Sequence, residues 1–352
     1  MKKIVSGLLL AASCTLLPAW ASGTMDVLSQ PAVVGPQALK AVLLDVNQAG
    51  SRLVAVGERG VVLLSDDGGQ QWRQTASPVS STLTSVQFVD EKNGWAVGHS
   101  GVVLHSGDGG ESWSLQLDGK QAAALELQAA QASGDAGRLA AAQRLSADGA
   151  DKPFLVVNFV DAQHGVVLGA YGLAMITEDG GKTWRSWMGE LPNPRGLHLY
   201  AMARDGNEFI IVGEQGLLLR STDGGQKFVP IEGPYEGSYF AAAILPDRRV
   251  LVGGLRGKLF SSEDGGSTFQ AVDNPVPASL NAIRVVGDHL VLVNQAGMLL
   301  QSKLSPIRLQ PIPVSDGLPL AAATQAADGA LVAVGVAGAR RLAPSSNTKT
   351  AD

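Results

Sequence analysis

Cysteine is nearly absent from this sequence: its 352 residues include a single one, Cys14. We expect the segment that holds Cys14 to be removed during export. A mature chain without cysteine cannot form a disulfide, use a thiolate nucleophile or bind zinc through sulfur. The scarcity of cysteine therefore excludes disulfide-stapled domains, thiol enzymes and zinc-thiolate sites together.

Long apolar segments are missing after the first 21 residues, so no later stretch is long enough to span a membrane as a helix. Residues 1–21 have the parts of a secretory signal peptide: Lys2 and Lys3, an apolar run over residues 4–17, and small residues before Ser22. We expect cleavage near Ala21 and a periplasmic or secreted mature protein. Lipidation at Cys14 is the alternative, although Ala11 stands where a lipoprotein signal has leucine.

An excess of basic residues is also lacking. Without residues 1–21 the chain has 25 basic and 32 acidic residues, a formal charge of −7. Proteins that bind nucleic acids need clustered positive charge against the phosphates. We therefore expect no nucleic-acid partner.

Glycine, in contrast, is abundant, with 43 residues, and many of them belong to a repeated unit. Each unit contains Gly-x-x-Gly, a short apolar run and the pattern Ser/Thr-x-Asp-x-Gly-x-x-Trp/Phe, which we call the Asp-box. The carboxylates and aromatic residues of the five complete boxes are Asp67 and Trp72, Asp108 and Trp113, Asp179 and Trp184, Asp223 and Phe228, and Asp264 and Phe269.

The spacing of the units indicates the fold. From Gly60 to Gly338 the second glycine recurs at intervals of 41, 71, 44, 41, 40 and 41 residues, a period typical of propeller blades. Two incomplete units, around Gly297 and Gly338, bring the number to seven. We predict an all-β fold, a seven-bladed β-propeller of four-stranded blades over residues 22–344, followed by a disordered tail over residues 345–352.

The last unit lacks the Asp-box that would begin its outer strand. We predict that the apolar residues 25–34 supply this strand, because closing the ring removes an exposed sheet edge. In the first unit we place strands at residues 39–44, 52–56, 61–65 and 72–75. The ring makes one domain, which we expect to be a monomer.

The Asp-box is best explained as a structural staple. Its carboxylate can accept backbone N–H bonds across a turn, its glycines allow the chain to reverse, and its aromatic ring can pack against a neighbouring hairpin. A metal or sugar site is the alternative, but one carboxylate per turn offers too few oxygens for calcium. We expect no metal and no cofactor.

Propeller topology places the Gly-x-x-Gly hairpins on the same face as the links between blades, and the Asp-boxes on the opposite side. We expect glycine to take the positive-φ positions of these hairpins. Binding residues concentrate on loops held by a rigid scaffold, and tyrosine is enriched at interfaces. We therefore predict partner contacts on the hairpin face at Arg59, His99, Tyr171, Tyr235, Tyr239 and Arg256.

The long 71-residue interval contains an insert over residues 120–152. Residues 121–132 and 137–145 are rich in strong helix formers, and Asp135 between them is suited to cap the second helix. The insert is either a hairpin that packs on the rim of the propeller or an arm that binds the partner. Leu125, Leu127, Leu139 and Leu145 would anchor it or meet the partner.

The repeated Val-Gly-x-x-Gly-x-(Val/Leu)-Leu-x-Ser-x-Asp-Gly-Gly-x-x-Trp units and the leading signal resemble the photosystem II stability and assembly factor family of Asp-box, or BNR-repeat, propellers. The resemblance covers nearly the whole mature chain. It implies a seven-bladed, non-enzymatic propeller that helps to build a membrane protein complex. An arginine patch binds the partner in photosynthetic members; Arg59 and Arg256 stand at matching hairpin tips here, whereas His99, Tyr171 and Gln215 occupy others.

The helical insert and the ordinary secretory signal depart from the photosynthetic members. The function implied is an envelope assembly, stability or accessory factor for a membrane protein complex, with an exporter among the clients to consider.

A secreted glycosidase or sialidase-like protein is the alternative function, because such enzymes also carry Asp-boxes. The sequence has no Phe/Tyr-Arg-Ile-Pro stretch, for which residues 193–196 and 246–249 are poor substitutes. Paired carboxylates for glycoside hydrolysis do not stand out either. Glu190, Glu214, Glu232 and Glu236 are isolated candidates, which are better explained as solvated loop charges.

Overall fold

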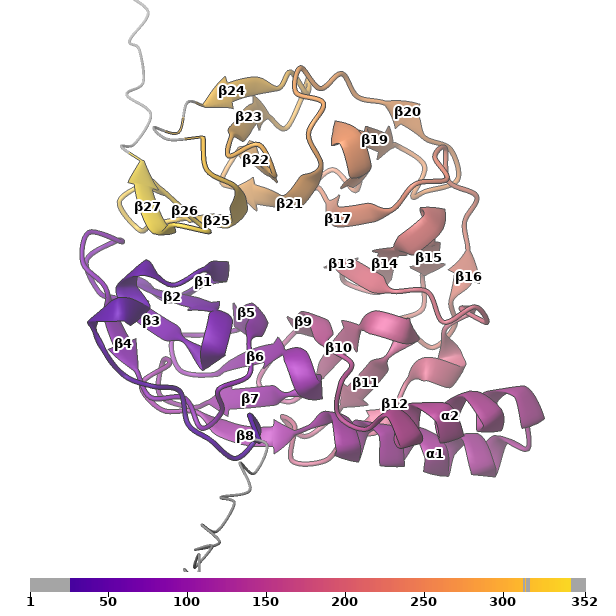
Figure 1. Cartoon of the computed structure of the whole chain (residues 1–352). Helices are drawn as coiled ribbons and strands as arrows, with labels where there is room; N and C mark the ends of the chain where they lie inside the picture. The colour runs from indigo at the N-terminus through magenta and orange to yellow at the C-terminus, as the bar shows by residue number, and fades with distance from the viewer. Residues whose placement is uncertain (1–25, 313, 315–316, 343–352) are drawn as a thin grey trace, which may run out of the picture.

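The structure, a computed structural model, describes residues 26–312, 314 and 317–342. The expected signal peptide over residues 1–21 and the expected tail over residues 345–352 lie outside these ranges. Within them the chain forms seven antiparallel sheets arranged in a ring, six with four strands and one with three (Figure 1). Neighbouring inner strands contact one another all the way around, so the predicted seven-bladed β-propeller is confirmed.

Each blade uses its strands in chain order from the centre to the rim. The inner strands are β1 (Leu43–Ala49), β5 (Leu83–Phe88), β9 (Phe154–Phe159), β13 (Leu199–Asp205), β17 (Tyr239–Ile244), β21 (Leu280–Val286) and β25 (Leu320–Gln325). The second strands are β2 (Arg52–Gly57), β6 (Gly94–Gly98), β10 (Gly165–Gly169), β14 (Glu208–Gly213), β18 (Val250–Gly254), β22 (His289–Asn294) and β26 (Leu331–Gly335). The third strands are β3 (Val62–Ser65), β7 (Val103–Ser106), β11 (Ala174–Thr177), β15 (Leu218–Ser221), β19 (Leu259–Ser262), β23 (Leu299–Lys303) and β27 (Gly338–Leu342). The outer strands are β4 (Arg73–Thr75), β8 (Ser114–Leu117), β12 (Arg185–Ser186), β16 (Val229–Pro230), β20 (Gln270–Ala271) and β24 (Gln310–Ile312).

Short 3₁₀ turns join the second and third strands of five blades at the Gly-x-x-Gly sequences. They are η2 (Glu58–Gly60), η3 (His99–Gly101), η4 (Ala170–Gly172), η6 (Glu214–Gly216) and η7 (Leu255–Gly257). The two other 3₁₀ turns are η1 (Pro36–Lys40), before the first blade, and η5 (Met188–Glu190), after β12.

The prediction that glycine takes the positive-φ positions of the hairpins holds for the second glycine of each hairpin, but the residue before it also has positive φ and the first glycine has another function. Gly60 does adopt positive φ (+73°), and so does the residue before it, Arg59 (φ 54°). Gly57 is extended instead (φ −170°), and a Cβ on it would lie 2.1 Å from the carbonyl oxygen of Val42. The first glycine is therefore required by the close approach of the incoming chain.

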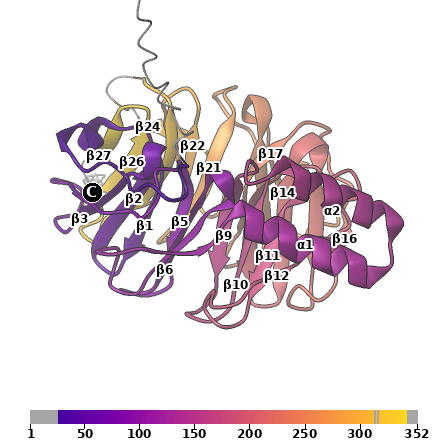
Figure 2. The same ribbon diagram turned by 60° about the horizontal axis from the view of Figure 1, so that its bottom comes forward.

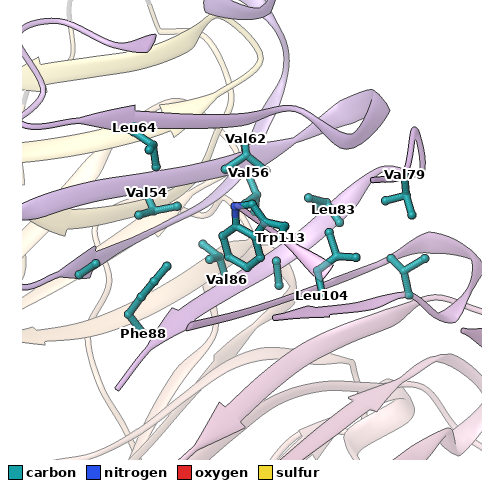
Figure 3. Close-up of a cluster of buried hydrophobic side chains, with 13 residues drawn as sticks. Val54, Val56, Val62, Leu64, Val79, Leu83, Val86, Phe88, Leu104 and Trp113 are labelled. Carbon is teal, nitrogen blue, oxygen red and sulfur yellow. The ribbon is translucent and has the colours of Figure 1, made fainter. Parts of the chain in front are cut away.

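The hydrophobic core lies between adjacent blades, because each sheet is apolar on both faces. Between blades 1 and 2, Val54, Val62 and Leu64 meet Leu83, Phe88 and Leu104, with Trp113 among them (Figure 3). Similar clusters fill the other junctions. Side chains of the inner strands add polar ties, such as Gln87, which accepts from the N–H and donates to the carbonyl oxygen of Phe159 in the next blade.

The predicted closing strand over residues 25–34 is wrong. Residues 26–34 form no strand, and the described part of the last blade has three strands. The segment lies instead against the link between blades 1 and 2, where Ala32 N–H donates to Ser77 O and Ser80 N–H donates to Val27 O, both at 3.0 Å. Pro31, which has no N–H, is poorly suited to the middle of a sheet ladder.

Side-chain packing closes the ring in place of a shared strand. Leu43 and Val46 of β1 share a buried cluster with Ala322 and Val334 of the last blade. The guanidinium of Arg341 donates to Gly68 O at 2.5 Å. The turn η1 occupies residues 36–40, so the first inner strand begins at Leu43 and not at residue 39 as predicted.

Candidate docking site on the tip face

The hairpin turns and the inter-blade links lie on one face, as predicted, and we call it the tip face. Backbone hydrogen bonds join each hairpin turn to the end of the link that leads into the same blade. Glu58 N–H donates to Val42 O (3.0 Å), and His99 N–H donates to Thr82 O (2.8 Å). The Asp-boxes lie at the other end of the strands, where Gly109 N–H donates to Lys92 O (3.0 Å) in the turn between β5 and β6.

A β-bulge near the start of every inner strand places one residue per blade beside the central channel. The pairing register between the first and second strands shifts there in all seven blades. Such bulges redirect side chains that regular alternation would send elsewhere. The residues at the shifts, all lining the channel, are Leu44, Thr84, Leu155, Tyr200, Phe240, Asn281 and Ala321.

Blades 3, 4 and 5 make the mouth of this channel aromatic and apolar. Leu155, Tyr200 and Phe240 line a cavity of about 260 Å³ at the mouth, together with the polar Thr84, Asn281 and Gln295. The rings of Tyr200 and Phe240 are 5.1 Å apart and inclined at 63°. An aromatic, half-buried surface with polar groups at its border is typical of sites that bind peptides or small molecules.

The mouth continues outward to an exposed tyrosine on the tip of blade 3. The ring of His198 lies 6.0 Å from that of Tyr200 and 4.8 Å from that of Tyr171, which is 54% exposed. Tyr171 N–H donates to Nδ1 of His198 at 3.1 Å. Burial, and secondarily the charge of Glu214, raise the pKa of Tyr200, so its hydroxyl stays a neutral hydrogen-bonding group. We call Tyr171, His198, Tyr200 and Phe240 the aromatic path.

The insert joins the tip face at both of its ends. It forms the predicted helical hairpin, α1 (Gly119–Ser133) and α2 (Ala136–Asp148). Asp118 caps α1 in a capping box, and the side chain of Asp135 accepts from Arg138 N–H, the predicted cap of α2. The start of α1 contacts the tip η3, and Nζ of Lys152, after α2, lies 4.8 Å from the centre of the Tyr171 ring.

The body of the insert packs on the rim of blade 3 (Figure 1 and Figure 2). Leu125 and Leu145 lie against the cluster between blades 2 and 3. Glu126, only 2% exposed, accepts two hydrogen bonds of 2.9 Å from Arg138 and a third from the hydroxyl of Ser186 in β12. The buried ion pair therefore joins the two helices of the hairpin, and packing and the bond from Ser186 dock the hairpin on the propeller.

The residues predicted as partner contacts have different environments. Arg59, His99, Tyr171 and Arg256 are exposed on hairpin tips. Tyr235 is half-buried beside Phe260.

The choice of Tyr239 is corrected by the structure. Tyr239 is fully buried between blades 4 and 5, where burial raises its pKa to about 12. The bulge that follows it turns the next residue, Phe240, toward the channel instead. Sequence reasoning missed Phe240 and Tyr200, although both follow the first residue of an inner strand, at equivalent points of the repeat.

Each Asp-box forms a closed set of local hydrogen bonds. In the second box, Ser106 Oγ donates to Asp108 Oδ1 (2.8 Å) and accepts from Gly110 N–H (2.8 Å). Ser112 donates its N–H to Oδ1 and its hydroxyl to Oδ2 of Asp108, at 3.0 and 2.6 Å. Trp113, 8% exposed, donates from Nε1 to Gly110 O at 3.0 Å.

The other boxes repeat the bonds of the hydroxyl and the carboxylate, whereas Nε1 of Trp184 has no hydrogen-bond partner among the described residues. Trp184 and Phe228 are also buried, whereas Trp72 and Phe269 are half-buried. With their carboxylates occupied in this way, the boxes act as turns that hold the blades.

Acid should weaken the boxes. Hydrogen bonds from the hydroxyl and N–H of Thr183 lower the pKa of Asp179 to about 2, and those from the N–H and hydroxyl of Thr268 lower the pKa of Asp264 to about 2. The ordinary value is 3.8, so these groups stabilise the fold above about pH 4, and the stabilisation is lost as the pH falls toward 2. The urea concentration at the midpoint of unfolding should therefore decrease as the pH is lowered from about 4 toward 2.

The variant Asp264→Asn tests the assignment. It should be less stable than the wild type at pH 6, and the two should converge near pH 2. A difference that stays constant over this range would contradict a proton-linked contribution from the box.

The isolated carboxylates considered for glycoside hydrolysis do not pair with one another. Glu190 lies 3.2 Å from Nη1 of Arg185, Glu214 lies 3.5 Å from His198, and Glu232 and Glu236 are exposed on a link. Among the described residues no group of three or more histidine, cysteine, aspartate or glutamate side chains is arranged to hold a metal ion. None of the helices in the described part of the chain is long and apolar enough to cross a membrane.

Together, the boxes and the seven blades define the class: an Asp-box β-propeller whose hairpin turns and inter-blade links lie on one face. The family model described as "Photosynthesis system II assembly factor YCF48" matches residues 37–139 and 139–235, more than half of the chain. The chain belongs to this family.

One curated relative matches part of the chain, and solved structures share its fold. The chain is 38% identical over 74 residues to "Photosystem II assembly lipoprotein Ycf48" of Synechococcus sp. (strain CC9902), a match that spans 21% of this chain and 22% of that protein. The structure of "YCF48 bound to D1 peptide" superposes with a TM-score of 0.65 at 18% identity, over 89% of this chain and 96% of that one.

Two further structures share the fold at low identity. YCF48 from Cyanidioschyzon merolae gives a TM-score of 0.62 at 17% identity, over 86% of this chain and 94% of that one. The WD40 propeller domain of Doa1 gives 0.61 at 13% identity, over 89% and 95%.

Proposed function

We propose that this protein is a non-enzymatic assembly, stability or accessory factor, which binds a segment of a membrane protein complex on its tip face from the periplasmic side. The observation that carries the proposal is the aromatic path, which leads from an exposed tip into the mouth of the channel. Membership of the YCF48 family supports the class of function. The relative solved as "YCF48 bound to D1 peptide" supports a peptide as the form of ligand.

The chemistry of the face also favours binding over catalysis. The side chains around the mouth are aromatic, apolar, hydroxyl or amide, and the nearby Glu214 is engaged with His198. A hydrolase needs an acid and a base at a defined separation across the substrate. The signal-like residues 1–21 support the periplasmic side, where the client could be a photosystem, an exporter or another complex of the inner membrane.

Photo-crosslinking in cells tests the proposal. A crosslinking amino acid placed at Gln295, on the border of the mouth, should capture a membrane protein that mass spectrometry can identify. The same group at Gln70, an exposed residue of the first Asp-box, is the matched control and should capture none. Equal capture from both positions, or capture from Gln70 alone, would move the docking site away from the tip face.

The double variant Tyr200→Ala and Phe240→Ala should reduce capture from Gln295 about tenfold or more, because large aromatic side chains dominate binding energies at interfaces. Both side chains are half-buried at the channel and lie outside the centres of the inter-blade clusters, so the fold should persist, as circular dichroism would verify. Undiminished capture by the folded double variant would show that the aromatic path does not contact the client.

A further inference from the structure

Below its mouth the channel contains a second feature, a cavity of about 270 Å³ that is lined by small apolar and by polar side chains. The inner strands of blades 4 to 7 contribute a wall of small side chains, namely Ala201, Ala241, Ala282 and Ala322. Three of them, Ala241, Ala282 and Ala322, are at most 5% exposed and also belong to the buried clusters between blades. The cavity shares Tyr200 and Phe240 with the mouth, so a ligand can enter from the tip face.

The polar lining comes mainly from blades 1 to 3 and from Arg284 of blade 6, and its one carboxylate is already satisfied. Asp45, 5% exposed, accepts from Val46 N–H at 2.9 Å through Oδ1. Its Oδ2 accepts from the hydroxyl of Ser85 at 2.8 Å and from Val86 N–H at 3.0 Å. These bonds join blade 1 to blade 2, so Asp45 is committed to the structure of the ring.

Several hydrogen-bond donors of this polar lining have no acceptor among the described residues. Among the described residues the only partner of the Arg284 side chain is Asp45, at 3.4 Å from Nη2, and a guanidinium has five N–H donors. The Arg284 side chain is 42% exposed, and it lines the cavity. The amide groups of Asn47 and Asn158 line it as well, and neither has a described acceptor.

We propose that the channel is a binding site for one carboxylate group, which enters from the mouth past the paired rings of Tyr200 and Phe240 and pairs with Arg284. A guanidinium binds a carboxylate through two parallel N–H···O bonds, and the neighbouring amides add further donors. The alanine wall receives the apolar atoms attached to the carboxylate. This site is independent of the identity of the membrane client, and it can be tested on the isolated protein.

Three small probes distinguish the sources of such a carboxylate. Acetyl-Ala-Leu with a free carboxylate represents a chain end, acetyl-aspartate amide represents an acidic side chain, and acetyl-Ala-Leu amide has no charge. Titrations followed through the methyl resonances of Ala201 and Ala322 should show binding of at least one acid and much weaker binding of the amide. Whichever acid binds more tightly identifies the source.

Two variants and one control connect the binding to the channel. Arg284→Gln should weaken binding of the acid probe about tenfold or more, because the variant loses a charge-assisted hydrogen-bonded pair. Ala321→Leu should block entry by bulk, and it should fold because leucine occupies the equivalent bulge in blades 1 and 3, at Leu44 and Leu155. Arg185→Gln, a half-exposed arginine on an outer strand, should bind as the wild type does.

The result is decisive in either direction. Equal binding of acid and amide, equal binding by wild type and Arg284→Gln, or no binding of either acid to the wild type would overturn the proposal. Crosslinked capture of a membrane client by Arg284→Gln would leave the proposed function standing, so the two hypotheses fail separately.

Discussion

Trp113→Ala is expected to lower the free energy of unfolding by about 3–5 kcal/mol, the loss typical of removing a large buried aromatic side chain. Trp113 is 8% exposed between blades 1 and 2, in the cluster that holds Val54, Val62 and Leu104. Its ring meets that of Phe88 edge to face, with centroids 5.9 Å apart. Alanine would leave a cavity that two rigid sheets cannot close, and urea unfolding followed by circular dichroism would measure the loss.

Trp72→Ala provides the matched control for this prediction. Trp72 has the same place in the first box, but it is half-buried beside the junction with the last blade. Part of its surface already faces water, so its removal should cost less than that of Trp113. Equal losses, or a loss below about 1 kcal/mol for Trp113→Ala, would contradict the view that the box aromatic derives its importance from inter-blade burial.

Replacement of residues 120–152 by a short Gly-Ser linker is expected to abolish capture of the membrane client, a decrease of about tenfold or more. The insert begins at the tip η3 and ends at Lys152 over Tyr171, so its loss removes one side of the docking face. The propeller should still fold, because exchanging a loop changes the closure entropy little. Its melting temperature should decrease, since α1 covers part of the cluster between blades 2 and 3.

Glu126→Ala keeps the insert in the protein but should loosen its attachment, so it tests whether the position of the insert matters for capture. This change leaves Arg138 and Ser186 without their buried partner, and breaking such a pair from one side is destabilising. Hydrogen exchange should show faster exchange in α1 and α2, with the other blades unaffected. If both this variant and the replacement capture the client normally, the insert is only a packed element and the mouth alone carries the docking.

Local patterns in the sequence account for most of the secondary structure. Helix-forming residues and the cap at Asp135 predicted helices over residues 121–132 and 137–145, which the structure extends to Gly119–Ser133 and Ala136–Asp148. The turn of each Asp-box could be predicted because the hydrogen bonds of its hydroxyl and carboxylate join residues at most four apart, as between Ser112 and Asp108. Interactions of this range depend on little beyond the repeat itself.

The residues of the docking site were harder to predict, as Tyr239 and Phe240 illustrate. A one-residue shift at a bulge exchanges the faces to which neighbouring side chains point. No sequence pattern distinguishes the bulge from a regular strand. Sequence reasoning therefore predicts Tyr239 as the partner contact, whereas Tyr239 is buried and Phe240 lines the channel. The same bulge in blade 4 places Tyr200 there.

By itself the sequence determined the number of blades, the two faces and the helical nature of the insert, since each follows from periodicity and short-range turn chemistry. Only the tertiary structure decided how the ring closes, which side chains enter the channel and where the insert rests. These depend on contacts between segments far apart in the chain, such as Leu43 with Val334 and Glu126 with Ser186. The shape and charge that blades present to one another around the ring select such contacts, and no single repeat contains that information.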